Sequence, residues 1–270
     1  MDQREHKIYV DGLYLKGYSY SLEGKQGQWD GSPILLLCHG IPAAPQPEGR
    51  GAGEKDGGYP ALAALCLQEG FNVFHFNFRG TGESEGNFDL AGWQRDLAAV
   101  LDYWEKERGI NTFLLWGFSA GAAVSCCAAA RDPRVKALVM AASPAEFASL
   151  FPAGEQQRLL AVMRQRGIIR DGAFPPDAAC WLRDIHAASP LTRISAIAPR
   201  PLLIIHGEED ELISCSHAHQ LYRAAGAGAE LMILPGAGHQ LRRYPHAVNC
   251  CLRWLRTQRH GPFAPARISY

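Results

Sequence analysis

The sequence predicts an α/β fold with a mostly parallel central sheet, an N-terminal antiparallel hairpin, helices on both faces of the sheet and a small helical cap. Two observations predict this fold. Apolar runs of strand length alternate with longer segments of helical periodicity, as in parallel strands joined by crossover helices. The 270 residues, of which 47% are hydrophobic and 20% are charged, are enough to bury one large core. We therefore expect a single domain over residues 1–270, with the cap inserted at 144–190.

The predicted sheet begins with a hairpin. Residues 7–10 and 13–18 flank Asp11-Gly12, a dipeptide that favours the tight turn between antiparallel strands. Buried parallel strands are predicted from four apolar runs, at 34–38, 73–78, 113–116 and 135–141. A last pair of strands is predicted at 201–206 and 230–234. Helices are predicted between the strands, at 59–69, 89–107 and 120–131.

Two segments interrupt this alternation, and both are expected at the carboxyl ends of the strands, where open α/β sheets bind ligands. Residues 43–58 are rich in Gly and Pro and predict a mobile loop. Residues 144–190 contain helical patterns at 155–166 and 176–187 and predict the cap. The large apolar side chains near these segments are candidates for a substrate pocket, and packing of the cap on the main domain is the alternative for most of them. These candidates are Phe118, Phe147, Phe151, Met163, Phe174 and Trp181.

The charge balance argues against nucleic acid or a membrane as partner. Lys plus Arg and Asp plus Glu number 27 each, so no net charge attracts a polyanion. Four of the first seven residues are charged, no apolar signal-peptide region follows them, and no apolar run is long enough to span a bilayer, so we expect a soluble, cytoplasmic protein. Most of the 8 cysteines lie in apolar strand or helix patterns and no C-x-x-C occurs, which favours free thiols over disulfides, metal or redox sites.

The motif Gly117-Phe118-Ser119-Ala120-Gly121 indicates a nucleophile. It follows the predicted strand at 113–116 and opens an Ala-rich helix, so Ser119 stands on a sharp strand-to-helix turn. In such a nucleophile elbow the glycines let strand and helix approach closely, and the strained backbone presents the hydroxyl. The alternative is a serine that caps the helix. A second copy of the pattern surrounds Ser84, where acidic residues flank the serine and no helix follows, and we interpret it as a polar loop.

A serine nucleophile needs a neighbouring base to take its proton. His239 is the candidate, because it follows the predicted strand at 230–234 in a loop of small residues. His206 precedes a glycine at a strand end and is expected to buttress the neighbouring loop. His217 and His219 lie in a helical pattern and are expected at the surface or in packing.

An acid must orient the base, and two backbone amides must stabilise the oxyanion. Asp210, after the predicted strand at 201–206, is the candidate acid, and spacing alone leaves Glu209 open. We expect the amides from Ala120, directly after the serine, and from Ile41, in the loop after the strand at 34–38. The alternative for that loop is a simple turn, which is compatible with the proposed role.

These motifs together resemble those of the α/β-hydrolase superfamily. The matching residues are His39-Gly40-x-Pro42, Asn77-Phe78-Arg79-Gly80-Thr81-Gly82-Glu83-Ser84-Glu85-Gly86, the elbow at Ser119, His206-Gly207-x-x-Asp210 and Gly238-His239. The chain looks most like small serine carboxylesterases akin to cinnamoyl and feruloyl esterases, and like the dienelactone hydrolase and acylaminoacyl-peptidase-like group. The resemblance implies the α/β-hydrolase fold and the triad of Ser119, Asp210 and His239, and it favours Asp210 over Glu209.

The functional hypothesis is a serine carboxylesterase that cleaves small to medium acyl or arylacyl esters through an acyl-enzyme, with no metal or other cofactor. A small-molecule ester is the expected partner. A thioesterase or acyltransferase, or a peptidase-like hydrolase, would use the same triad. A non-catalytic binding module on the same fold is the alternative of another class. The sequence indicates neither the natural ester nor the oligomeric state.

Overall fold

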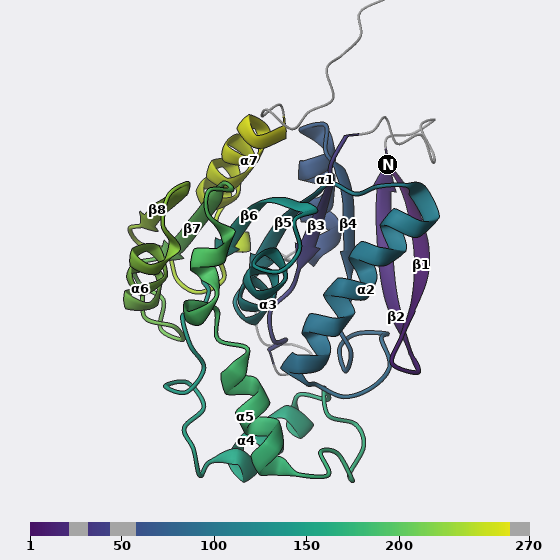
Figure 1. Cartoon of the computed structure of the whole chain (residues 1–270), viewed down its shortest axis with the longest axis vertical. Helices are drawn as coiled ribbons and strands as arrows, with labels where there is room; N and C mark the ends of the chain where they lie inside the picture. The colour runs from purple at the N-terminus through teal and green to yellow at the C-terminus, as the bar shows by residue number, and fades with distance from the viewer. Residues whose placement is uncertain (22–31, 44–57, 260–270) are drawn as a thin grey trace, which may run out of the picture.

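Eight strands form one sheet in the computed structural model, which describes residues 1–21, 32–43 and 58–259. The strands are β1 (Asp2–Val10), β2 (Leu13–Ser21), β3 (Ile34–Cys38), β4 (Asn72–Phe76), β5 (Phe113–Phe118), β6 (Val135–Ala141), β7 (Leu202–Gly207) and β8 (Ala229–Leu234). They lie side by side in the order β1-β2-β4-β3-β5-β6-β7-β8 (Figure 1). Nearly all of the predicted loop at 43–58 falls outside the described residues.

The N-terminal hairpin turns at Asp11-Gly12, as predicted. Both residues have positive φ angles, 52° and 80°, as in the tight turns that match the twist of antiparallel strands. β2 is also antiparallel to β4, and the remaining neighbouring pairs are parallel. The prediction of a mostly parallel sheet that opens with an antiparallel hairpin is therefore confirmed.

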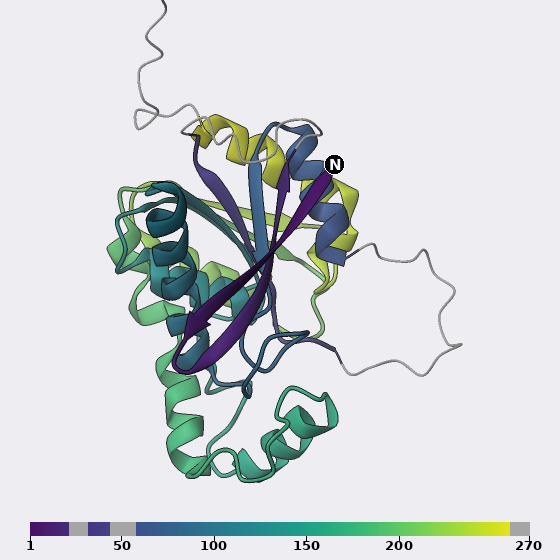
Figure 2. The same cartoon turned by 90° about the vertical axis from the view of Figure 1, so that its right-hand side faces the viewer.

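Helices cover both faces of the sheet (Figure 2). One face packs against α1 (Gly58–Gln68) and α7 (Pro245–Arg259), and the other packs against α2 (Leu90–Arg108), α3 (Ala120–Ala129) and α6 (Ser216–Ala225). Alternate side chains of β3 therefore enter two different cores, with Leu35 in the first and Leu36 in the second. None of the helices within the described ranges is long and apolar enough to cross a bilayer.

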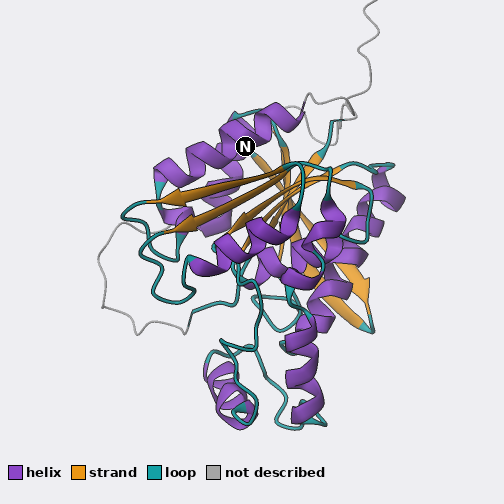
Figure 3. Cartoon of the chain, turned by 60° about the vertical axis from the view of Figure 1, so that its left-hand side comes forward, coloured by secondary structure: helices purple, strands orange, loops and turns teal. Residues whose placement is uncertain are grey.

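The segment at 144–190, the predicted cap, lies beyond one end of the sheet and packs against the layer that contains α2 (Figure 3). Its helices are α4 (Gln156–Gln165) and α5 (Ala178–Ala187), which agree with the two helical patterns of the sequence. The cap leaves and rejoins the main domain at one place, because the Leu191 amide donates to the Ala145 carbonyl over 2.9 Å. The short 3₁₀ helices after the cap and before α7 are η1 (Pro190–Thr192), η2 (Ile194–Ile197) and η3 (Leu241–Arg243).

The cysteines are free thiols, as predicted. Burial raises the pKa of Cys38 to about 12, and it also raises the pKa of Cys126 and Cys251. A buried thiol that stays protonated near neutral pH is a poor nucleophile. These cysteines therefore act as small apolar side chains of the core.

Candidate active site

Ser119 occupies a strained turn between β5 and α3. Its φ and ψ angles are 54° and −125°, a conformation that L-residues rarely adopt. The turn is tight enough that a Cβ added at Gly121 would lie 2.5 Å from the Cys38 carbonyl oxygen, and one at Gly117 would lie 2.8 Å from the Ala122 nitrogen. Within the described residues the Ser119 side chain makes no capping bond to α3, so the helix-cap alternative does not hold.

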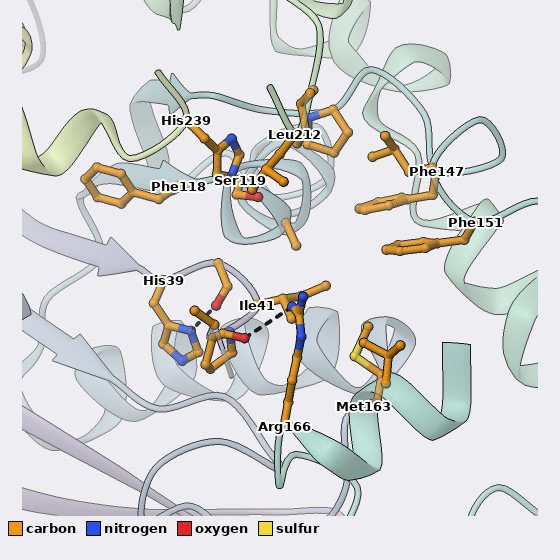
Figure 4. Close-up of a pocket in the computed structure, with 18 of the residues that line it drawn as sticks. His39, Ile41, Phe118, Ser119, Phe147, Phe151, Met163, Arg166, Leu212 and His239 are labelled. Carbon is orange, nitrogen blue, oxygen red and sulfur yellow. Dashed lines mark hydrogen bonds between the residues drawn. The ribbon is translucent and has the colours of Figure 1, made fainter. Parts of the chain in front are cut away.

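A histidine and a carboxylate meet at the neighbouring strand ends. The His239 Nδ1 lies 2.7 Å from the Asp210 Oδ2. An ionised carboxylate only accepts hydrogen bonds, so Nδ1 carries the ring proton and Nε2 is left as an acceptor. Figure 4 shows Ser119 and His239 together on one wall of the cavity that both residues line. A neutral imidazole with a free Nε2 is the form that takes a proton from a serine hydroxyl.

The Asp210 carboxylate is buried and accepts hydrogen bonds on both oxygens. Its Oδ1 accepts from the amides of Leu212 and Ile213, each over 2.9 Å, and its Oδ2 lies 3.1 Å from the His206 Nε2. Burial alone would raise the pKa of Asp210, but hydrogen bonds from His206, His239 and the Ile213 amide outweigh it. The pKa therefore lies well below its usual range, and the carboxylate is charged at neutral pH.

A glycine at the end of β7 lets the acid loop and the base loop approach closely. A Cβ at Gly207, the end of β7, would lie 2.7 Å from the Gly238 carbonyl oxygen, so only glycine permits this approach. The Gly238 amide in turn donates to the Tyr244 hydroxyl over 2.9 Å, which holds the residue before His239. By contrast, the acidic neighbours of Asp210 are exposed, namely Glu208, Glu209 and Glu211.

The loop after β3 runs directly beside the elbow. A Cβ at Gly40 would lie 2.9 Å from the Cβ of Ser119 and 3.5 Å from its Oγ. Ile41 and Ala120, the predicted sources of the two amides, line the same cavity as Ser119. Ala120 is the first residue of α3, where backbone amides lack partners within the helix and carry partial positive charge. The arrangement can place two donors near a developing negative charge.

His39 holds this loop in place. Its Nδ1 donates to the Gly40 carbonyl over 2.7 Å, and its Nε2 accepts from the Phe78 amide over 3.1 Å. Burial lowers the pKa of His39 to about 4, so the ring is neutral near pH 7. A neutral ring with one donor and one acceptor satisfies both contacts, whereas a protonated ring would lose the second.

The second G-x-S-x-G copy has a structural role. Ser84 is fully buried, and its Oγ donates to the Asn77 carbonyl over 2.5 Å and accepts from the Lys16 amide over 2.9 Å. The preceding Arg79 forms a buried ion pair with Asp96, with Nη2 and Oδ1 separated by 2.6 Å. This motif therefore anchors the loop that carries Phe78, which contacts His39.

A cavity of about 1010 Å³ lies between the strand ends and the cap (Figure 4). Four of the six predicted pocket residues line it, namely Phe118, Phe147, Phe151 and Met163. Trp181 and Phe174 do not. Trp181 is buried in the cap, where its indole N–H donates to the Phe88 carbonyl over 3.1 Å and its ring packs against the Phe88 ring. Phe174 packs half-buried against the core. For these two residues the packing alternative was the right one.

Sequence reasoning missed the charged and aliphatic side chains that α4 contributes. The face of α4 toward the cavity carries Leu159, Val162 and Met163, and Arg166 continues the same helical spacing directly after the last residue of α4. Arg158 and Arg242 also line the cavity. The sequence did contain a signal, namely the helical spacing of Leu159, Val162, Met163 and Arg166 within the predicted helix at 155–166. Of these four, only Met163 was among the pocket candidates.

The chain belongs to the family described as the α/β hydrolase fold, whose model matches residues 33–181. This range contains Ser119 and ends before Asp210 and His239. The human protein ABHD12B is 29% identical over 203 residues, which are 73% of this chain and 51% of that protein. YfhR of Escherichia coli K12, itself uncharacterised, is 25% identical over 192 residues, or 70% of this chain and 60% of YfhR. The chain thus spans about half to three fifths of these relatives.

Solved structures share the fold at low sequence identity. Est1E from Butyrivibrio proteoclasticus, solved with ferulic acid bound, is similar with a TM-score of 0.69 and 20% identity, over 94% of this chain and 98% of Est1E. The Pyrococcus furiosus esterase Pf2001 gives a TM-score of 0.68 and 18% identity, over 95% of this chain and 92% of Pf2001. The predicted α/β-hydrolase fold is therefore confirmed.

Proposed function

We propose that this chain is a serine hydrolase of the carboxylesterase type, with Ser119 as nucleophile, His239 as base and Asp210 as the orienting acid. The observation that carries this proposal is the 2.7 Å contact of His239 with Asp210 beside a serine held in a strained turn. Membership of the α/β hydrolase fold family and the likeness to esterases support a hydrolase.

The proposed reaction passes through an acyl-enzyme. His239 Nε2 takes the hydroxyl proton of Ser119 as its Oγ attacks the ester carbonyl carbon, and the amides of Ile41 and Ala120 stabilise the oxyanion. The tetrahedral intermediate collapses, and the leaving alkoxide takes the proton from His239. A water molecule then gives a proton to His239 and attacks the acyl carbon, and the acid leaves as Ser119 recovers its proton.

The cavity supports small to medium acyl or arylacyl esters as substrates. Its volume of about 1010 Å³ is at the upper end of the range of small-molecule sites. Phe147 and Phe151 lie on the cap side of the cavity as parallel rings with centroids 6.0 Å apart. Such a wall suits an apolar or aromatic acyl chain. Est1E, which has a similar fold, was solved with ferulic acid bound, and ferulic acid is an aromatic acid of the kind that an arylacyl ester would release.

Hydrolysis of p-nitrophenyl and methyl arylacyl esters, combined with labelling by a fluorophosphonate probe, tests the proposal. Ser119→Ala should lower kcat at least about 1000-fold without unfolding, and mass spectrometry should find the label of the wild type on Ser119. Ser84→Ala is the matched control and should keep the label on Ser119. A label on Ser84 instead would refute the assignment of Ser119 as the nucleophile.

The same assay separates the alternatives. Faster turnover of an acyl-CoA than of the matching oxygen ester would reassign the chain to the thioesterases. Transfer of the acyl group to an added alcohol would indicate an acyltransferase, and cleavage of peptides alone would indicate a peptidase. Absence of both turnover and labelling would favour a binding module.

A further inference from the structure

The cavity carries more positive than negative side chains. Among the described residues that line it, Arg158, Arg166 and Arg242 are cationic and Glu155 is anionic. Glu155 pairs with Arg158 at 3.2 Å, and the guanidinium of Arg242 lies over the Tyr59 ring at 5.0 Å. Arg166 forms no ion pair within the described part of the chain. One guanidinium in the candidate active site therefore lacks a carboxylate partner from those residues.

Arg166 is half-buried, and its side chain lines the cavity. It follows the last residue of α4, and its side chain extends past Met163 toward Ile41 (Figure 4). Its Nη1 donates to the Pro42 carbonyl over 3.3 Å, which fixes the guanidinium next to the loop that contains Ile41. A guanidinium has five N–H donors in a planar fork, so this single bond leaves most of them available.

The cap side of the cavity has an apolar wall in addition to its charged residues. Met163 and the stacked rings of Phe147 and Phe151 form that wall, and none of them accepts a hydrogen bond from the guanidinium. A cation beside apolar walls gains most from a ligand that brings an opposite charge, because solvent screens the pair less there. A ligand with an apolar body and one anionic group fits both parts of the cavity.

We propose that the ester hydrolysed here is an anion, with a carboxylate or phosphate group bound by Arg166 and an apolar part along Met163, Phe147 and Phe151. This inference rests on the proposed esterase function and names its substrate class. Arg166 selects the substrate, because its planar fork donates two parallel hydrogen bonds to two oxygens of the anionic group. The loop of Ile41 and Pro42 then lies between the anion site and Ser119.

Pairs of esters that differ in charge test the proposal. Mono-p-nitrophenyl adipate and p-nitrophenyl 5-phosphonopentanoate are compared with p-nitrophenyl hexanoate, and 4-carboxyphenyl hexanoate is compared with phenyl hexanoate. At least one anionic ester should have a kcat/KM roughly 10- to 100-fold above that of its neutral partner, mainly through KM. The adipate and phosphonate arms distinguish a carboxylate from a phosphate-like group.

Substitution of Arg166 tests whether this residue causes the preference for anionic esters. In Arg166→Gln the ratio of anionic to neutral kcat/KM should fall roughly 10- to 100-fold, and Arg166→Lys, which keeps the charge and loses the fork, should restore part of it. Arg164→Gln is the control, because Arg164 lies two residues before Arg166, in the last turn of α4 and outside the cavity, and donates to the Phe174 carbonyl. The ratio of anionic to neutral kcat/KM in Arg164→Gln should match that of the wild type.

Binding separates failure of this inference from failure of the esterase proposal. Calorimetry on Ser119→Ala should find monomethyl adipate bound more tightly than the uncharged methyl hexanoate, and the additional substitution Arg166→Gln should remove the difference. If monomethyl adipate binds through Arg166 but the wild type hydrolyses no ester, the anion site stands and the esterase proposal fails. If neutral esters react as fast as anionic ones, or Arg166→Gln slows both equally, Arg166 only holds the Pro42 loop and the inference is wrong.

Discussion

Asp210→Asn should nearly abolish hydrolysis while keeping the size of the side chain. Three donors converge on the carboxylate: His239 on Oδ2, and the amides of Leu212 and Ile213 on Oδ1. The His206 Nε2, which donates to the Ile213 carbonyl over 2.8 Å, lies 3.1 Å from Oδ2. Asparagine offers one acceptor oxygen, so its NH₂ group faces either the two amides or the His239 N–H. If NH₂ faces His239, the ring must move its proton to Nε2, which removes the base.

The magnitude follows from these contacts. Loss of the correct tautomer lowers kcat about 10³- to 10⁴-fold, or roughly 4 to 5.5 kcal/mol in the barrier. Each charge-assisted hydrogen bond contributes about 1.5–3 kcal/mol. Asparagine weakens one or two of them but removes the cost of burying a charge, so the free energy of unfolding should fall by only about 2 kcal/mol. A protein that folds and does not turn over substrate is therefore expected.

Steady-state hydrolysis of p-nitrophenyl hexanoate measures the effect on activity, and urea unfolding measures the effect on stability. Glu209→Gln is the matched control, because Glu209 is exposed next to Asp210, and its kcat should stay within about twofold of the wild type. Loss of activity in Glu209→Gln with retention in Asp210→Asn would refute the assignment of the acid. A fall of less than about 10-fold in Asp210→Asn would show that His239 is oriented by other contacts.

Three further predictions concern the scaffold of the site. Gly40→Ala should lower kcat roughly 10-fold or more in a folded protein, because the new Cβ would lie 2.9 Å from the Cβ of Ser119, and an unchanged kcat beside an unchanged circular dichroism spectrum would contradict this. Asp96→Ala should lower the free energy of unfolding in urea by about 3 kcal/mol, since it removes the buried carboxylate that pairs with Arg79, and a loss below about 1 kcal/mol would argue against the pair. Stability should fall as the pH drops from about 7 toward 4, because the pKa of His39 is about 4 when buried, against about 6.5 unfolded, and the unfolded chain binds the proton first. His39 alone contributes about 3 kcal/mol to this loss, and a flat stability profile in urea at about pH 7, 6 and 5 would reject the explanation.

Strands were predictable where burial on both faces leaves an uninterrupted apolar run. The run at 34–38 coincides with β3 (Ile34–Cys38) for this reason. The run at 113–116 stopped two residues short of the end of β5, because Gly117 breaks the apolar pattern although it still pairs with Met140 of β6. Periodicity in a sequence records side-chain burial, whereas the end of a strand depends on backbone pairing.

The parts of the site that lie in local motifs were also predictable from sequence. The sharp turn at Ser119 was predictable because its motif consists of five consecutive residues. The base loop was predictable because Gly238 directly precedes His239. The position of Arg166 on the cavity face was available from helical spacing, but its contact with Pro42 was not, because that contact joins residues 124 positions apart. Trp181 was assigned to the pocket because an aromatic side chain in a cap suits either role, and only its bond to Phe88 decides between them.

The meeting of the two ends of the cap at Ala145 and Leu191 has a consequence for how such enzymes diversify. A segment that departs and returns at one point can be exchanged for one of another length without shifting the strands on either side. Ser119, Asp210 and His239 all lie outside the segment. Transplanting a cap from a relative would therefore change the part of the cavity wall that the cap supplies and leave Ser119, Asp210 and His239 in their places.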